Sequence, residues 1–134
     1  MNRILLVLVA LITMGTAAAA QPFNTLIASG PVYGGLAQTQ VSCFILNGGV
    51  NPITLTNARI VEFPGTSLPL TANSCTGTLA GGLMCNWTVT TILSTQPHAC
   101  SILVMSLLQG APYIRGELNI LTVLGTVLHV EEMK

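Results

Sequence analysis

The chain has 134 residues, of which 51% are hydrophobic and 6% are charged, and its formal net charge at pH 7 is zero. It contains no Asp, and its four basic and four acidic side chains are too few for a basic surface stripe, which excludes nucleic acid as a partner. A nearly uncharged surface is weakly protected against self-association, so the composition favours a protein that works in contact with another molecule.

The N-terminal segment has the pattern of a cleaved export signal. Arg3 supplies a positive charge, residues 4–14 form an apolar run, and Ala18-Ala19-Ala20 is a small-residue cleavage site. The apolar run is too short for a transmembrane helix, which needs about 20 apolar residues. We therefore expect residues 1–20 to be a signal peptide of bacterial type. Residues 21–134 are then a single secreted domain, periplasmic or extracellular, without a membrane span.

Turn signals made of Gly, Pro and Asn recur along the rest of the chain, with short runs rich in Val, Ile, Leu and Thr between them. Regular turns between short β-rich runs are typical of an all-β sandwich or barrel. No window combines a helical period with helix caps. The expected strands, in chain order, are Gln38–Leu46, Ile53–Phe63, Leu68–Ala72, Leu83–Ile92, Ala99–Leu107, Ile114–Thr122 and Thr126–Glu131.

Three of these segments carry further signals. In Ile53–Phe63 the apolar positions change phase near Asn57-Ala58, which indicates a β-bulge. Leu68–Ala72 contains Pro69, which confines it to a sheet edge. The last two strands should form a hairpin around Leu124-Gly125, and its free edge could accept or donate a strand.

Four cysteines follow the expected signal peptide, namely Cys43, Cys75, Cys85 and Cys100. An even number in a secreted chain predicts two disulfides, for which three connectivities are open. The Gly81-Gly82 turn favours a Cys75–Cys85 bridge, which leaves Cys43 and Cys100 to join two separate strands. Because the spacing lacks the paired Cys or His motifs of a zinc site, we expect neither a metal nor another cofactor.

About seven strands, with Cys43 early and Cys100 late, resemble an immunoglobulin-like antiparallel β-sandwich that a disulfide bridges between its two sheets. The chain departs from antibody-type domains because Trp87 comes late, two residues after Cys85, and because His98 replaces the tyrosine expected before the second Cys. Trp87 shares a strand face with Cys85, which favours a core position beside that disulfide over a ligand platform. A small β-barrel is the structural alternative.

The sequence predicts no enzyme. A serine triad lacks its acid, because there is no Asp, and the Gly-x-Ser-x-Gly motif is also absent. His98 is interpreted as a structural residue and His129 as part of a solvated strand face. The adjacent Glu131 and Glu132 would point to opposite faces of a strand, unlike the paired carboxylates of a glycosidase.

Two expected strands are apolar on both faces, whereas a strand of an antiparallel sandwich normally alternates apolar and polar side chains. If Cys43 and Cys100 point inward, several large apolar side chains must point outward. These candidate interface residues are Phe44, Leu46, Leu103, Met105 and Leu107. Either the segment Phe23–Tyr33 or the terminal hairpin covers them, or they form an exposed patch for a partner.

The sequence therefore predicts a secreted, non-enzymatic binding or assembly module that acts through an apolar sheet face or a strand edge. Its partner would be a protein, a cell-surface component or a second copy of itself. One alternative is a structural subunit of an extracellular or envelope assembly, comparable to a fimbria. Another is a small secreted inhibitor or hydrolase, and the loop Pro64–Pro69 is the candidate inhibitory loop.

Overall fold

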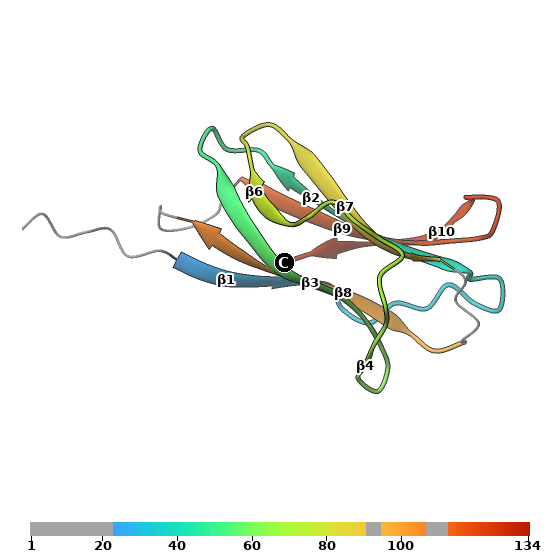
Figure 1. Ribbon diagram of the computed structural model, residues 1–134. Helices are drawn as coiled ribbons and strands as arrows, with labels where there is room; N and C mark the ends of the chain where they lie inside the picture. The colour runs from blue at the N-terminus through green and yellow to red at the C-terminus, as the bar shows by residue number, and fades with distance from the viewer. Residues whose placement is uncertain (1–22, 91–94, 107–112) are drawn as a thin grey trace, which may run out of the picture.

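The computed structural model describes residues 23–90, 95–106 and 113–134, which form two antiparallel β-sheets packed face to face (Figure 1). The strands are β1 (Phe23–Ala28), β2 (Gln40–Asn47), β3 (Ile53–Glu62), β4 (Thr66–Ser67), β5 (Ala72–Asn73), β6 (Gly77–Leu79), β7 (Met84–Thr90), β8 (His98–Ser106), β9 (Ile114–Leu121) and β10 (Val127–Met133). Sheet A has the order β1-β8-β3-β4, with β6 also paired to β3, and sheet B has the order β10-β9-β2-β7-β5. Within these ranges no helix is long and apolar enough to cross a membrane.

Six of the seven predicted strands lie close to their predicted bounds, but the prediction of a strand over Leu68–Ala72 is wrong. Strand β4 ends at Ser67 in sheet A, and β5 begins at Ala72 in sheet B. The segment between them carries the chain from one sheet to the other, and Pro69 has no N–H with which to continue a ladder. Apolar composition alone did not distinguish this crossing from an edge strand.

The two outer sheet faces are not covered in the way the sequence suggested. The segment Phe23–Ala28 pairs with β8 as an edge strand, and the β9–β10 hairpin extends the edge of sheet B. The two edges meet where the backbones of Ala28 and Lys134 exchange hydrogen bonds of 2.9 and 3.0 Å. Both segments therefore widen and join the sheets, and neither folds over the outward side chains of β2 or β8.

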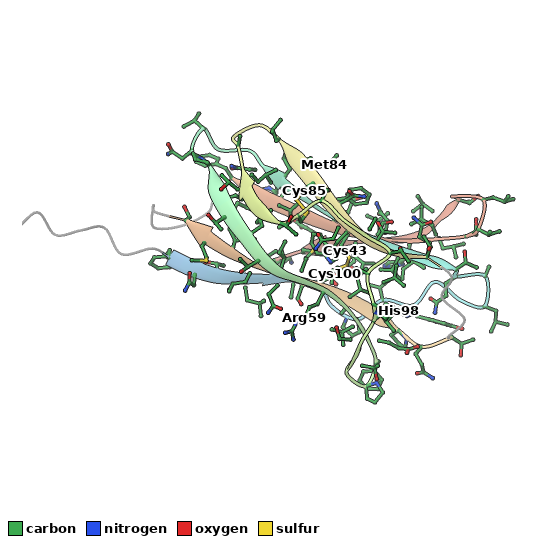
Figure 2. All side chains as sticks on the ribbon, viewed as in Figure 1. Cys43, Arg59, Met84, Cys85, His98 and Cys100 are labelled. Carbon is green, nitrogen blue, oxygen red and sulfur yellow. A yellow bond between two sulfur atoms is a disulfide. The ribbon has the colours of Figure 1, made fainter. Side chains whose placement is uncertain are left out.

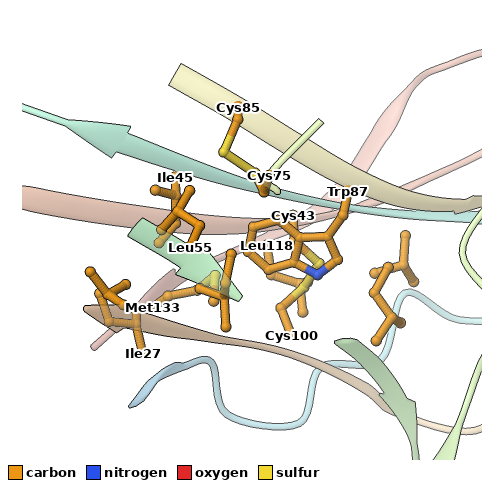
Figure 3. Close-up of a cluster of buried hydrophobic side chains, with 14 of the residues drawn as sticks. Ile27, Cys43, Ile45, Leu55, Cys75, Cys85, Trp87, Cys100, Leu118 and Met133 are labelled. Carbon is orange, nitrogen blue, oxygen red and sulfur yellow. A yellow bond between two sulfur atoms is a disulfide. The ribbon is translucent and has the colours of Figure 1, made fainter. Parts of the chain in front are cut away.

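The core between the sheets is centred on the disulfide that joins Cys43 in β2 to Cys100 in β8 (Figure 3). The Cα atoms of this pair are 6.2 Å apart, and 57 positions separate the two residues in sequence. Trp87 is fully buried and is the cross-strand neighbour of Cys43, so its ring lies beside this bridge. The indole Nε1–H donates a 3.0 Å hydrogen bond to the backbone carbonyl of Arg59 in sheet A, which satisfies the buried donor.

The second disulfide joins Cys75, between β5 and β6, to Cys85 in β7. Its Cα atoms are 5.2 Å apart, and 10 positions separate the two residues in sequence. Both bridges follow the pairing that the sequence favours. The shorter one ties the β5–β6 connection to strand β7 of sheet B, whereas the longer one holds the two sheets together.

A β-bulge in β3 sets the direction of the side chains that follow it. The pairing with β8 shifts register between Thr56 and Arg59, and Asn57 has a φ of 58°. Because the bulge inserts an extra residue, Ile60 points into the core while Arg59 points to the solvent. The prediction of a bulge near Asn57 is confirmed, and its consequence is that Arg59 lies on the outer face of sheet A.

Removing each disulfide separately should distinguish their contributions to stability. In the chain-entropy relation, loss of the long bridge through Cys43→Ala with Cys100→Ala lowers the free energy of unfolding by about 4 kcal/mol. Loss of the short bridge through Cys75→Ala with Cys85→Ala lowers it by about 2.7 kcal/mol. Urea unfolding followed by Trp87 fluorescence measures both values. An equal or larger loss for the short bridge would contradict the central role assigned to the inter-sheet bond.

Candidate functional site

The outer face of sheet B presents a set of apolar side chains near one end of its strands. Phe44 and Leu46 alternate with the buried Cys43 and Ile45 along β2, and so they point away from the core. Met84 in β7 is the cross-strand neighbour of Leu46, and the exposed fractions of these two residues are 63% and 38%. Large apolar side chains that stay exposed on adjacent strands mark a candidate contact surface.

These side chains belong to a groove of about 630 Å³, a size in the range of ligand-binding pockets. It is named the sheet B groove here, and its lining residues are Phe44, Leu46, Met84, Arg115, Gly116, Glu117, Asn119 and Glu132. They come from β2, β7, β9 and β10, four neighbouring strands of one sheet. The groove therefore lies across the strands rather than at an edge.

Charged side chains gather beside the apolar part of the sheet B groove. Glu117 is paired in register with Phe44 on one side and with Glu132 on the other. Arg115 is paired with Leu46, and its Nη1 donates a 3.1 Å hydrogen bond to the carbonyl of Ile114. Two carboxylates and one guanidinium give the groove a net charge of −1. Its chemistry suits an apolar partner that also carries a cation.

Polar side chains adjoin the apolar part of the sheet B groove on one side. Toward the N-terminal end of β2, the Ser42 hydroxyl lies 3.1 Å from the Thr88 hydroxyl and accepts a 2.9 Å hydrogen bond from Gln40 Nε2. Asn119 forms the wall on this side, and its Oδ1 is buried without a hydrogen-bond partner among the described residues. The apolar side chains of the groove itself are Phe44, Leu46 and Met84, while Val130, 49% exposed, lies beside Asn119 on the same face outside the groove.

The candidate interface residues from the sequence fall on two opposite surfaces of the sandwich. Phe44 and Leu46 lie on sheet B, whereas Leu103 and Met105 are half-buried on the outer face of sheet A. Figure 2 shows Met84 and Arg59, which mark these two outer faces, on opposite sides of the Cys43–Cys100 disulfide. Leu107 lies outside the described residues.

The two histidines occupy different environments. His98 is fully buried at the start of β8, and neither of its ring nitrogens has a hydrogen-bond partner among the described residues. Burial lowers the pKa of the His98 imidazole, and the smaller effect of the nearby Glu62 carboxylate raises it. His129 is exposed on β10, with its Nε2 atom 4.0 Å from Oε2 of Glu131. Neither histidine lines the sheet B groove.

The described residues also show where metal-binding and acidic groups lie. No three His, Cys or Glu side chains gather around one point in these ranges, and all four cysteines are in disulfides. Glu131 pairs with the inward-facing Leu118, while Glu132 pairs with Glu117 on the outer face. The adjacent glutamates therefore point to opposite faces of the strand, as the sequence predicts.

Sequence reasoning missed six of the eight lining residues of the groove, and the reasons differ among the charged and apolar ones. The sequence contains a signal that Glu117 and Glu132 face each other, because the two residues are equidistant from the predicted hairpin turn at Leu124-Gly125. Met84 and Arg115 have no such signal. Both become neighbours of Leu46 only through the register of β7 and β9 against β2.

The chain matches no protein-family model, and comparison with curated proteins and with solved structures gives no match either.

The facing carboxylates of Glu117 and Glu132 should reduce stability, because like charges directly opposite each other on a sheet repel. Glu132→Gln is expected to raise the free energy of unfolding by about 0.2–1 kcal/mol at neutral pH and low salt. Glu131→Gln is the matched control, since its side chain points to the other face. Urea unfolding of both variants tests this, and an equal gain in the control would show that the facing pair is not the cause.

Burial of His98 should make the protein less stable in weak acid. The unfolded chain binds a proton near the ordinary imidazole pKa of 6.5, while the folded chain binds it at a lower pH. The free energy of unfolding therefore falls as the pH drops from about 7 through 6.5 and below. The variant His98→Leu should lose most of this dependence between pH 7 and 5. Parallel pH dependence in the two proteins, measured by urea unfolding, would contradict it.

Proposed function

We propose that this chain is a secreted, non-enzymatic module that binds a protein partner in the sheet B groove. The observation that carries this proposal is the concentration of charge. Of the eight charged side chains in the sequence, Arg115, Glu117 and Glu132 line this one groove, around an apolar floor of Phe44, Leu46 and Met84. An apolar centre with a polar rim is the usual anatomy of a protein–protein contact.

A sheet face is a better candidate than a strand edge for this contact. The β10 edge of sheet B is engaged at its C-terminal end, where Lys134 exchanges backbone hydrogen bonds with Ala28 of β1. Strand addition needs a run of unpaired backbone groups along an edge. The shortened free edge of β10 therefore supports strand addition less than the groove supports docking.

The alternative functions have weaker support. The carboxylates of Glu117 and Glu132 lie side by side on one sheet, whereas glycosidase carboxylates flank the scissile bond from two sides. The candidate inhibitory loop Pro64–Pro69 is part of the β3–β4 hairpin. There Gly65 N donates to the carbonyl of Glu62 and Leu68 N to that of Ile60, at 2.8 and 2.9 Å. These bonds describe an ordinary strand connection.

Export and an immunoglobulin-like topology remain part of the proposal. Two disulfides are typical of proteins that mature in an oxidising compartment. A disulfide between two packed antiparallel sheets, with a buried tryptophan beside it, supports the resemblance to immunoglobulin-like sandwiches. The expected signal peptide, residues 1–20, lies outside the described residues.

Site-specific photo-crosslinking in the native host tests the binding role. A benzophenone side chain at position 84 is expected to give a discrete adduct with a protein partner. The same side chain at position 63 is a control, because Phe63 is exposed to a similar degree, at 60%, but lies in the β3–β4 turn outside the groove. Absence of an adduct at position 84, with the domain correctly exported and oxidised, would overturn the proposal. A smear of adducts of equal strength at both positions would also overturn it.

A further inference from the structure

We infer that the occupant of the sheet B groove is a second copy of this chain, which docks with the outer face of its sheet A. This inference rests on the proposed function and names the partner of the same groove. The surface that would dock is named the sheet A face, and it consists of Leu26, Leu103, Met105 and Arg59.

The sheet A face has an apolar part of its own. Leu103 and Met105 alternate with the buried Ile102 and Val104 along β8, and both are half-buried. Leu26 of β1 is the cross-strand neighbour of Leu103 and is 62% exposed. The face therefore offers adjacent aliphatic side chains on two strands, as the groove does with Leu46 and Met84.

Arg59 places a cation beside this apolar part. It is paired with Ser101, two residues before Leu103 on β8, so it lies on the same face. Its Nε donates a 2.8 Å hydrogen bond to Asn57 Oδ1, which holds the side chain over the bulge. In residues 23–90, 95–106 and 113–134, no carboxylate lies within ion-pair distance of Arg59. The guanidinium can thus meet an acidic partner.

The two surfaces are complementary in charge. Arg59 gives the sheet A face a charge of +1, and no Glu lies on this face in the described strands, because Glu62 pairs with the inward-facing His98. Glu117, Glu132 and Arg115 give the sheet B groove a charge of −1. Opposite net charges next to apolar centres favour docking of one face on the other, while two copies of the same face would repel.

The positions of the surfaces determine the kind of assembly. They lie on opposite sides of one sandwich, whose sheets are fixed by the Cys43–Cys100 bridge (Figure 2). One chain therefore cannot bring its own two surfaces together, and each docked copy leaves one surface free. Such a head-to-tail contact repeats and gives open stacks rather than a closed dimer.

Light scattering on the oxidised domain of residues 21–134, measured against concentration, tests this inference. The wild-type domain is expected to form dimers and longer species as concentration rises, and added salt should weaken them. Arg59→Glu should weaken this association at least about ten-fold, because like charges then face each other. Lys134→Glu is the control, since it makes the same change of charge at an exposed residue outside both surfaces. It should associate like the wild type.

A charge exchange identifies the groove as the other half of the contact. Glu117→Lys changes the groove from −1 to +1 and should weaken association like Arg59→Glu. A mixture of the two single variants should associate again, because each then meets an oppositely charged surface. The double variant Arg59→Glu with Glu117→Lys should also associate alone. Unfolding midpoints and intact disulfides verify that each variant is folded.

Two results would overturn the inference. The first is a wild-type domain that stays monomeric up to about 1 mM, which is a weak affinity for an interface. The second is association that Arg59→Glu leaves unchanged. A discrete crosslink from position 84 to a different protein, found together with a monomeric domain, would retain the binding role of the groove and exclude the second copy. Failure of the two proposals is therefore distinguishable.

Discussion

The disulfide between Cys43 and Cys100 fixes the two strands on which every other surface depends. It joins β2 and β8, which lie in the interior of their sheets. Because successive side chains of a strand alternate, a cysteine that points inward forces its neighbours outward, and a shift of one residue would exchange the two faces. Trp87, bonded through its indole to sheet A, holds the same alignment without a covalent link. The inward positions of Cys43 and Cys100, which close the core, therefore also direct Phe44 and Leu103 outward.

The bulge in β3 adds a second, independent constraint. Without the extra residue at Asn57, the alternation that buries Ile53 and Leu55 would direct Arg59 inward and Ile60 outward. A buried guanidinium without a partner is costly, so the apolar pattern and the charge favour the same bulged register. The outward position of Arg59 thus follows from local backbone geometry in sheet A, while the acidic groove follows from hairpin pairing in sheet B. Two separate features of the chain produce complementary surfaces.

Alternation and cysteine spacing predicted most of the fold, because both depend on neighbours that are close in sequence or covalently linked. The strands, the bulge and the pairing of the disulfides have such signals. The prediction of a strand over Leu68–Ala72 is wrong because its composition fits a strand, whereas the segment crosses between the sheets around Pro69. The sequence predicted only part of the groove. Phe44 and Leu46 follow from alternation, but Met84 and Arg115 join them through pairing of distant strands, which no local pattern encodes.

Because the chain carries few charges, the compartment in which it folds is important. A domain with apolar side chains on both outer faces and few charges is weakly protected against association. These faces are held in register by a bridge that contributes about 4 kcal/mol, a large share of the 5–15 kcal/mol typical of a domain. Before oxidation the sheets lack this tie, and the two surfaces are not yet rigidly opposed. If export proceeds as the sequence predicts and the groove binds as we propose, the Cys43–Cys100 bond makes both surfaces rigid only in the oxidising compartment, where the partner would also be found.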